Sequence, residues 1–206
     1  MNTTIMNFFS IDCSTEVGSL FAKVENKTFS KVLQSDKFLN DLIAKHIIDF
    51  LAENNIKLND LGQIFVNQGP GSFSGLRSSL AIAKGISLSK NINLFGYDTF
   101  IWSCAKFIDK KKSICCITKF REKYYIKNFD TNFKGVQKIE ESSKDNIIKK
   151  YTDKLKVVPI NVSQQFDQEI LKLKNIKIVN LDHNDLEFLQ LKGLLDEGLI
   201  KPLYLS

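Results

Sequence analysis

The chain has 206 residues, of which 43% are hydrophobic and 25% are charged, and its formal net charge is +6. This length suits one domain of two lobes or two small domains, with enough apolar residues for a core. The composition excludes a membrane span and a secretory signal, because no apolar run approaches ~18 residues and the N-terminus lacks a basic segment. The four cysteines form neither a C-x-x-C pair nor a metal-binding pattern, which favours reduced thiols and a cytoplasmic location. Because no membrane span is expected, we expect no membrane partner either.

The first part of the chain shows strand signals followed by a helix signal. Three β-rich runs with short polar links predict an antiparallel meander, at residues 5–12, 17–24 and 28–34. Apolar residues then recur at i, i+1, i+4 and i+5 over residues 36–54, which is typical of an amphipathic helix that Ser35 or Asp36 can cap. His46 interrupts this apolar stripe, and a lone imidazole there predicts a packed or interface residue rather than a metal ligand.

The next segments predict parallel crossovers. We expect strands at 64–66 and 94–96 and helices at 74–90 and 100–107. The order βββαβαβα predicts a mixed sheet covered by helices. In the α/β class this order is the half-unit of the actin-like ATPase or ribonuclease-H-like architecture.

The remaining residues predict a reduced second lobe. Expected strands lie at 113–118, 124–129, 157–160 and 176–181, and expected helices lie at 145–151, 166–173 and 186–199. We therefore expect an N-terminal lobe over residues 1–108, a reduced lobe over 109–182, and a C-terminal helix and tail over 183–206 that return to the first lobe.

Residues 63–90 combine an apolar run, a glycine-rich turn and small residues at helical spacing. A helix N-terminus behind such a turn can hold phosphate, although neither G-x-x-x-x-G-K-[ST] nor G-x-G-x-x-G is present. Plain turn geometry is the alternative. A cation in the first helical turn opposes the helix dipole and indicates either a bound anion or a solvated side chain. The candidate phosphate contacts are Asp12, Ser14, Thr15, Gly69, Gly71, Ser72 and Arg77.

The helix over 74–90 carries a ridge of small residues, at Gly75, Ser79, Ala83 and Ser87. Small ridges allow two helices to approach closely. Because apolar residues flank this ridge on both sides, we expect the helix to pack on its own sheet and on a further surface as well.

The segment 106–156 is basic, with a net charge of +8 against −2 for the other residues. Such a lobe can meet an acidic partner or an RNA backbone. A solvated face in a lysine-rich chain is the alternative.

The sequence resembles the TsaB (YeaZ) family at three places. These are the turn D-C-S-T at 12–15, the run G-P-G-S-F-S-G-L-R at 69–77 with A-K-G at 83–85, and the tail K-P-L-Y-L at 201–205. The family's usual D-A-R-x-x-E-V-Y is replaced by T-K-F-R-E-K-Y-Y at 118–125, so we carry no role over to that hairpin.

The resemblance implies an actin-like fold and a non-catalytic partner of TsaD, which transfers threonylcarbamoyl to the adenosine following the anticodon of tRNAs. It further implies a helical bundle with TsaD, or with a second copy when TsaD is absent, and a TsaE-type ATPase in the complex. It implies no tightly bound cofactor, with ATP or ADP at the interface with TsaD, and only weak or indirect tRNA contact. The expected interface residues are Phe38, Leu42, His46, Gly75, Leu76, Ser79, Leu80, Ala83 and Ser87.

Three functions are therefore weighed: a scaffold, an active actin-like enzyme and an RNA-binding module. The two histidines, His46 and His183, do not form the His-x-x-x-His pair on which TsaD depends, and Asp12 is the only obvious acidic candidate for phosphoryl transfer. We therefore expect no catalytic residue and no metal site. The alternative is a nucleotide-using kinase or a peptidase-labelled homologue.

Overall fold

The computed structural model describes residues 6–15, 17–33, 39–110, 113–131, 133, 138–151 and 153–205. These residues fall into two compact units. The first comprises residues 1–98 and 195–206, and the second comprises residues 99–194. The units therefore divide after Asp98 and after Leu194, where the sequence places boundaries after residues 108 and 182.

The first unit is built on a five-stranded mixed sheet with the order β3-β2-β1-β4-β5. Its strands are β1 (Phe8–Asp12), β2 (Gly18–Val24), β3 (Lys27–Leu33), β4 (Gln63–Gly69) and β5 (Asn93–Asp98). Strands β1, β2 and β3 pair antiparallel, whereas β4 pairs parallel to β1 and to β5. The predicted meander and crossovers are thus confirmed.

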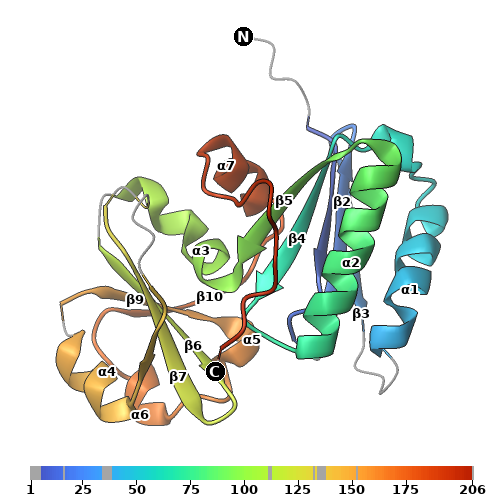
Figure 1. Cartoon of the computed structure of the whole chain (residues 1–206). Coiled ribbons are helices and arrows are strands. Elements are labelled where there is room, and N and C mark those ends of the chain that lie inside the picture. Colours follow the sequence, from blue (N-terminus) through green and yellow to red (C-terminus); the bar gives the residue numbers. More distant parts are fainter. Residues whose placement is uncertain are drawn as a thin grey trace. The chain divides into compact units, whose positions relative to one another are not determined.

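Two helices of this unit, α1 (Leu39–Glu53) and α2 (Phe73–Lys90), lie side by side against the sheet (Figure 1). The core between helices and sheet contains Phe9, Ile43, Ile64 and Ala83. The caps expected at Ser35 and Asp36 lie outside the described residues. Ser72 caps α2 as predicted, because its hydroxyl accepts a hydrogen bond from the Gly75 N–H.

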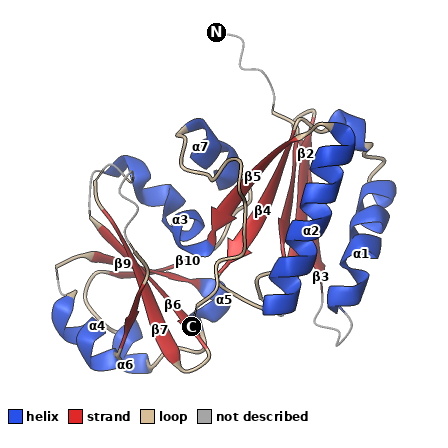
Figure 2. Cartoon of the chain, viewed as in Figure 1, coloured by secondary structure: helices blue, strands red, loops and turns tan. Residues whose placement is uncertain are grey.

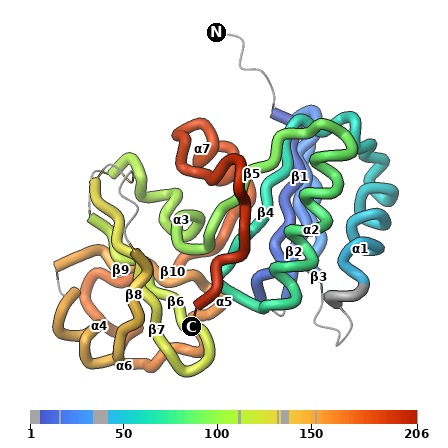
Figure 3. The backbone as a smooth tube through the Cα atoms, viewed as in Figure 1, coloured from blue at the N-terminus to red at the C-terminus, as the bar shows by residue number. Residues whose placement is uncertain are grey.

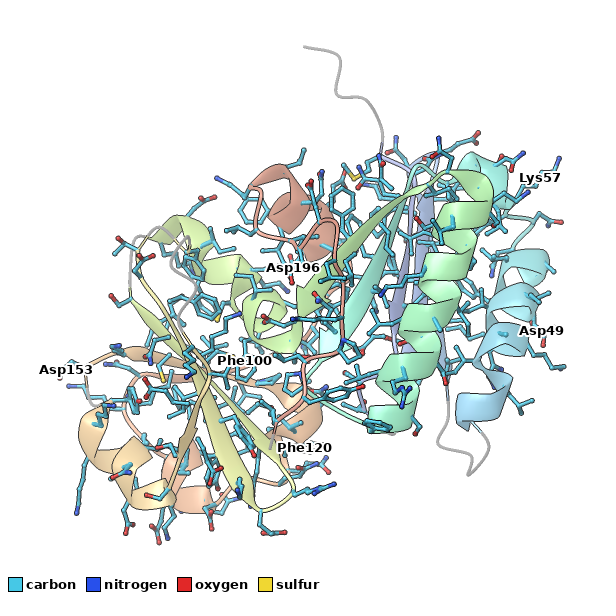
Figure 4. The ribbon with its side chains drawn as sticks, in the orientation of Figure 1. Asp49, Lys57, Phe100, Phe120, Asp153 and Asp196 are labelled. Atoms are coloured by element: carbon cyan, nitrogen blue, oxygen red, sulfur yellow. The ribbon has the colours of Figure 1, made fainter. Side chains whose placement is uncertain are left out.

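The C-terminal segment packs on the same sheet, as the tube in Figure 3 shows for the stretch beside β4 and β5. Asp196, labelled in Figure 4, exchanges two backbone hydrogen bonds with Gly96 of β5. Farther along, the Leu203 N–H donates to the Gln68 carbonyl oxygen over 2.6 Å, and the Ile200 side chain is only 1% exposed. The segment is therefore an integral part of the first unit.

The second unit holds another five-stranded mixed sheet with the order β10-β9-β6-β7-β8 (Figure 2). Its strands are β6 (Ile114–Phe120), β7 (Lys123–Phe129), β8 (Glu140–Ser142), β9 (Leu155–Pro159) and β10 (Ile176–Val179). Its helices are α3 (Thr99–Cys104), α4 (Lys144–Lys150), α5 (Ile160–Ser163), α6 (Gln168–Leu171) and α7 (Asp185–Leu191), with 3-10 turns η1 (Leu58–Asp60) in the first unit and η2 (Ala105–Lys110) after α3.

The second unit departs from the sequence prediction at several elements. Helix α7 ends at Leu191 instead of residue 199, because Gly193, directly after the C-cap Lys192, takes a positive φ angle of 67°. Helix α6 covers only four residues, and the short elements β8 and α5 were not predicted. Across the described residues, no helix combines the length and apolar character needed to cross a bilayer.

Candidate functional site

The turn after β1 and the glycine-rich turn before α2 are joined directly through their backbones. The Ser72 N–H donates a 2.8 Å hydrogen bond to the Ser14 carbonyl oxygen. At Gly71 a Cβ atom would lie 1.8 Å from that same oxygen. The absence of a side chain at Gly71 therefore permits the close approach of these two turns.

A buried polar network continues from this contact to the end of β4. Asp12 Oδ1 accepts from the Ser14 N–H over 2.9 Å and from Asn67 Nδ2 over 3.1 Å. Asn67 also accepts a 2.8 Å hydrogen bond from the Gly69 N–H through its Oδ1. Asp12 is only 6% exposed, and burial raises the pKa of its carboxyl group despite these hydrogen bonds.

The same contacts show how this turn uses its hydrogen-bond donors. The N–H groups of Gly69 and Ser72 donate within the chain, and the Thr15 hydroxyl donates to the Val17 carbonyl oxygen. The Arg77 guanidinium lies over the Phe73 ring, 5.0 Å from its centroid. These donors are engaged within the chain, as plain turn geometry requires, and phosphate contact at this turn stays a prediction.

Within the described residues, no three His, Cys, Asp or Glu side chains are grouped so that they could hold a metal ion. His183 instead lies 4.8 Å from Trp102, measured between ring centroids. Burial lowers the pKa of its imidazole to about 4.

The structure corrects the predicted interface on α2. Five of the expected interface residues are buried against the unit's own sheet and α1: Gly75, Leu76, Ser79, Leu80 and Ala83. Ser87 is half-buried, and its hydroxyl donates to the Ile92 carbonyl oxygen over 2.6 Å. The ridge of small residues therefore packs inside the first unit and leaves no surface for a foreign helix.

The opposite side of α2 is the exposed one. Phe73 is 57% exposed and Leu88 is 85% exposed, and Ala81 and Gly85 are also exposed. A Cβ atom added at Gly85 would meet nothing within 4 Å. We call the residues Phe73, Ser74, Arg77, Ala81, Lys84, Gly85 and Leu88 the outer face of α2.

Helix α1, which packs beside α2, also carries exposed apolar side chains. Leu42 is 39% exposed and Ile48 is 67% exposed, whereas His46 is half-buried. Phe38, also expected at the interface, lies outside the described residues. Leu42 and His46 are thus the expected interface residues that retain accessible surface on α1.

The C-terminal segment contributes an aromatic side chain to the start of α2. The Tyr204 ring stacks on Phe73 with 5.2 Å between centroids, and Tyr204 is itself 51% exposed. The K-P-L-Y-L tail identified in the sequence therefore places Tyr204 at the border of the outer face.

The second unit contains an open hollow of about 610 Å³. It is lined by Lys119, Glu122, Lys123, Tyr124, Glu141, Ser142, Ser143, Lys144, Asn146 and Asp167. Its charged groups have partners within the chain. Lys123 pairs with Glu141 at 2.8 Å, Lys144 pairs with Glu169 at 3.0 Å, and the Tyr124 hydroxyl donates to Asp167. The hollow is thus electrostatically balanced by its own residues.

Comparisons with known proteins place these features in a family. The family model described as "TsaD: tRNA N6-adenosine threonylcarbamoyltransferase" matches residues 35–155, more than half of the chain. A "tRNA threonylcarbamoyladenosine biosynthesis protein TsaB" from Buchnera aphidicola subsp. Baizongia pistaciae (strain Bp) is 30% identical over 135 residues, covering 62% of this chain. The protein of the same name from Escherichia coli (strain K12) is 25% identical over 96 residues, covering 47% of this chain.

The sequence matches span about half the length of these curated relatives, at 53% and 42% respectively. Solved structures match over more of the chain. YeaZ from Pseudomonas aeruginosa superposes with a TM-score of 0.67 at 15% identity, covering 97% of this chain and 100% of that one. An uncharacterized protein described as similar to peptidase YEAZ gives a TM-score of 0.70 at 14% identity, covering 98% of this chain and 100% of that one.

The structural matches show the fold. Together with the two mixed sheets and their strand order, they confirm the predicted actin-like, ribonuclease-H-like α/β class. The chain therefore matches the TsaD family model over more than half of its length, and it belongs to the TsaB (YeaZ) family that its named relatives represent.

Proposed function

We propose that this chain is a non-catalytic subunit that binds a TsaD-type protein and supports threonylcarbamoyl transfer to the adenosine following the anticodon of tRNAs. The names of its relatives support a role in tRNA threonylcarbamoyladenosine biosynthesis. In this proposal the TsaD-type protein carries the catalytic groups, and a TsaE-type ATPase joins the same assembly. A second copy of the chain can occupy the docking surface when the partner is absent.

The observation that carries this proposal is the set of exposed apolar side chains on adjacent helices. Phe73 and Leu88 on α2 and Ile48 on α1 are each more than half exposed. Isolated exposed apolar residues are ordinary, but a group of them on two neighbouring helices indicates a binding surface. We assign the docking surface to the outer face of α2 with Leu42 and Ile48 of α1.

The polar network around Asp12 supports the non-catalytic part of the proposal. The Asp12 carboxylate is buried and accepts hydrogen bonds from the Ser14 backbone and the Asn67 side chain. A group engaged in this way fixes the turn after β1 and has little access to a substrate. Because the turn at Gly71 is closed against Ser14, ATP or ADP would bind together with the partner and not in this turn.

The docking surface is tested with Leu88→Asp. This leucine is 85% exposed, so the change should leave the chain folded while placing a charge in the contact. Leu191→Asp is the matched control, because Leu191 is 71% exposed on the second unit. We expect Leu88→Asp to weaken co-elution with the TsaD-type protein at least about tenfold and to reduce tRNA threonylcarbamoylation accordingly. The control should retain both.

Equal binding of the TsaD-type protein by Leu88→Asp and Leu191→Asp would overturn the assignment of the docking surface.

The non-catalytic role has its own test in Asp12→Asn, which keeps an acceptor oxygen and removes the charge. We expect the reconstituted complex carrying Asp12→Asn to modify tRNA within about twofold of the wild-type rate, whereas loss of a catalytic carboxylate would lower the rate by orders of magnitude. A loss of that size with an intact complex would show that the chain takes part in chemistry.

A further inference from the structure

The outer face of α2 carries positive charge and no negative charge. The helix contains Arg77, Lys84 and Lys90 and neither Asp nor Glu over its 18 residues. Arg77, Lys84 and Leu88 are separated by seven and four residues, so they share one side of the helix. The apolar contact residues that α2 contributes, Phe73 and Leu88, therefore lie among cations.

The charges of these cations are left unpaired in the described part of the fold. In the part of the chain that the structure describes, no ion pair involves Arg77, Lys84 or Lys90. Helix α1 differs, because Lys45 pairs with Asp49 at 3.1 Å, and Glu53 pairs with Lys31 of β3 at 2.8 Å. The described ion pairs of this region thus involve α1 and β3 and not α2.

Arg77 is also held in place by an aromatic side chain of the same helix. Its guanidinium lies 5.0 Å from the centroid of Phe73, and Phe73 in turn stacks on Tyr204. Both rings remain more than half exposed. Aromatic and arginine side chains that are already ordered lose little conformational entropy on binding, and they contribute strongly to protein interfaces.

The charge pattern affects two candidate occupants in opposite ways. In a symmetric dimer centred on α2, the same patch of each copy meets the other, so Arg77 and Lys84 would face their own counterparts. Like charges brought together in an interface disfavour the complex, whereas an oppositely charged partner surface is attracted.

We propose that the outer face of α2 selects its partner by charge: it fits an acidic surface on the TsaD-type protein and disfavours a second copy of this chain. The inference rests on the proposed function, since it concerns the same docking surface. Arg77 and Lys84 determine the selectivity, and Phe73, Leu88 and Tyr204 supply the apolar contact.

The two complexes should respond to salt in opposite directions. We expect the dissociation constant for the TsaD-type protein to rise about fivefold or more between 50 and 400 mM NaCl, because salt screens attraction between exposed charges. The homodimer, measured by sedimentation of the chain alone, should tighten over the same range. A homodimer that weakens with salt, or a heterodimer that ignores it, would overturn the proposal.

The role of Arg77 and Lys84 in selecting the partner is tested with the double variant Arg77→Gln, Lys84→Gln. It removes the two charges and keeps long polar side chains. We expect it to bind the TsaD-type protein at least about fivefold more weakly at 50 mM NaCl and to form a tighter homodimer. The matched control is Lys27→Gln, Lys57→Gln, two exposed lysines of the same unit, of which Lys57 is labelled in Figure 4. It makes the same change in net charge and should behave as the wild type.

The outcomes separate this inference from the proposed function. If Leu88→Asp abolishes binding but the Arg77, Lys84 variant matches its control, docking occurs on α2 without selection by charge. If Leu88→Asp has no effect either, the docking surface itself is misplaced. If the Arg77, Lys84 variant and the Lys27, Lys57 control weaken binding of the TsaD-type protein equally, the total net charge of the chain determines binding and the outer face of α2 does not.

Discussion

The backbone N–H of Ser72 donates to the carbonyl oxygen of Ser14 over 2.8 Å, and this contact brings together two turns that lie 58 residues apart in the chain. This hydrogen bond can form because Gly71, the residue before Ser72, has no side chain that would clash with the Ser14 carbonyl oxygen. Gly71, in the glycine-rich run by which the sequence resembles the TsaB (YeaZ) family, therefore serves backbone packing in this chain. Helix α2, which follows this turn, carries the surface that we assign to partner binding.

Replacing Gly71 with alanine should destabilise the protein. The new Cβ atom would lie 1.8 Å from the Ser14 carbonyl oxygen, so the two turns would have to separate and we expect a loss of about 2–4 kcal/mol in unfolding free energy. Gly85→Ala is the control, because a Cβ there meets nothing within 4 Å and alanine favours a helix interior by about 0.5–1 kcal/mol. Urea denaturation measures both, and equal effects would contradict the packing role of Gly71.

Ile200 and Leu199 provide a matched pair in the C-terminal segment. Ile200 is 1% exposed within the core of the first unit, whereas Leu199 is 80% exposed. We expect Ile200→Ala to lower the unfolding free energy by about 2–5 kcal/mol and Leu199→Ala to change it by less than about 0.5 kcal/mol. Thermal or urea unfolding compares the two. Similar small losses would mean that the segment contributes little to the first unit.

The buried carboxyl group of Asp12 should make stability depend on pH. Because burial raises its pKa in the folded state, the neutral form is favoured there, and its stabilising contribution is fully present below the unfolded pKa of about 3.9. This contribution is lost as pH rises through the raised folded pKa. We therefore expect the stability of Asp12→Asn relative to wild type to increase from pH 4 to pH 7 in urea unfolding. A stability difference between Asp12→Asn and wild type that stays constant from pH 4 to pH 7 would contradict this prediction.

Removing the Tyr124 hydroxyl should weaken the second unit. This group donates to Asp167 Oδ2 over 2.5 Å and accepts from the Asp167 N–H over 3.1 Å, which fixes the start of α6. We expect Tyr124→Phe to cost about 1–2 kcal/mol in unfolding free energy. Tyr204→Phe, at a tyrosine that is 51% exposed, should cost little in the same measurement. A loss for Tyr204→Phe as large as for Tyr124→Phe would argue against a specific role of the pair.

The sequence predicted those parts of the fold that depend on local signals. The first hairpin turns at Glu25 and Asn26, both of which take positive φ angles, and a two-residue polar link between apolar runs is a recognisable turn. Helix α2 begins directly after Ser72, its N-cap residue. The capping hydrogen bond from the Gly75 N–H to the Ser72 hydroxyl is also a local contact, within one turn of the helix.

The inward side of α2 could not be predicted in the same way. Gly75, Ser79 and Ala83 recur every four residues, and so do Phe73, Arg77 and Ala81. Either set satisfies helical periodicity, and only the position of the sheet decides that the first set is buried. The contact between Gly71 and Ser14 was equally hidden, because it joins segments distant in sequence.

The C-terminal prediction failed for a related reason. Apolar residues continue at helical spacing up to Leu199, but the chain leaves the helix at Gly193 and Asp196 pairs with Gly96 instead. Strand β8 escaped detection because its sequence, Glu140-Glu141-Ser142, is polar and strand signals rely on apolar or β-branched residues.

Because the segment after Leu194 belongs to the same unit as residues 1–98, synthesis on the ribosome delivers the two portions of that unit at very different times. The strands and helices made first must wait, with the binding site for Ile200 open to solvent, until the whole of the second unit has been translated. Nascent chains with apolar surface exposed in this manner are prone to aggregation and are typical clients of chaperones. A premature stop codon anywhere between Thr99 and Leu194 would therefore damage the part of the protein that had already been made.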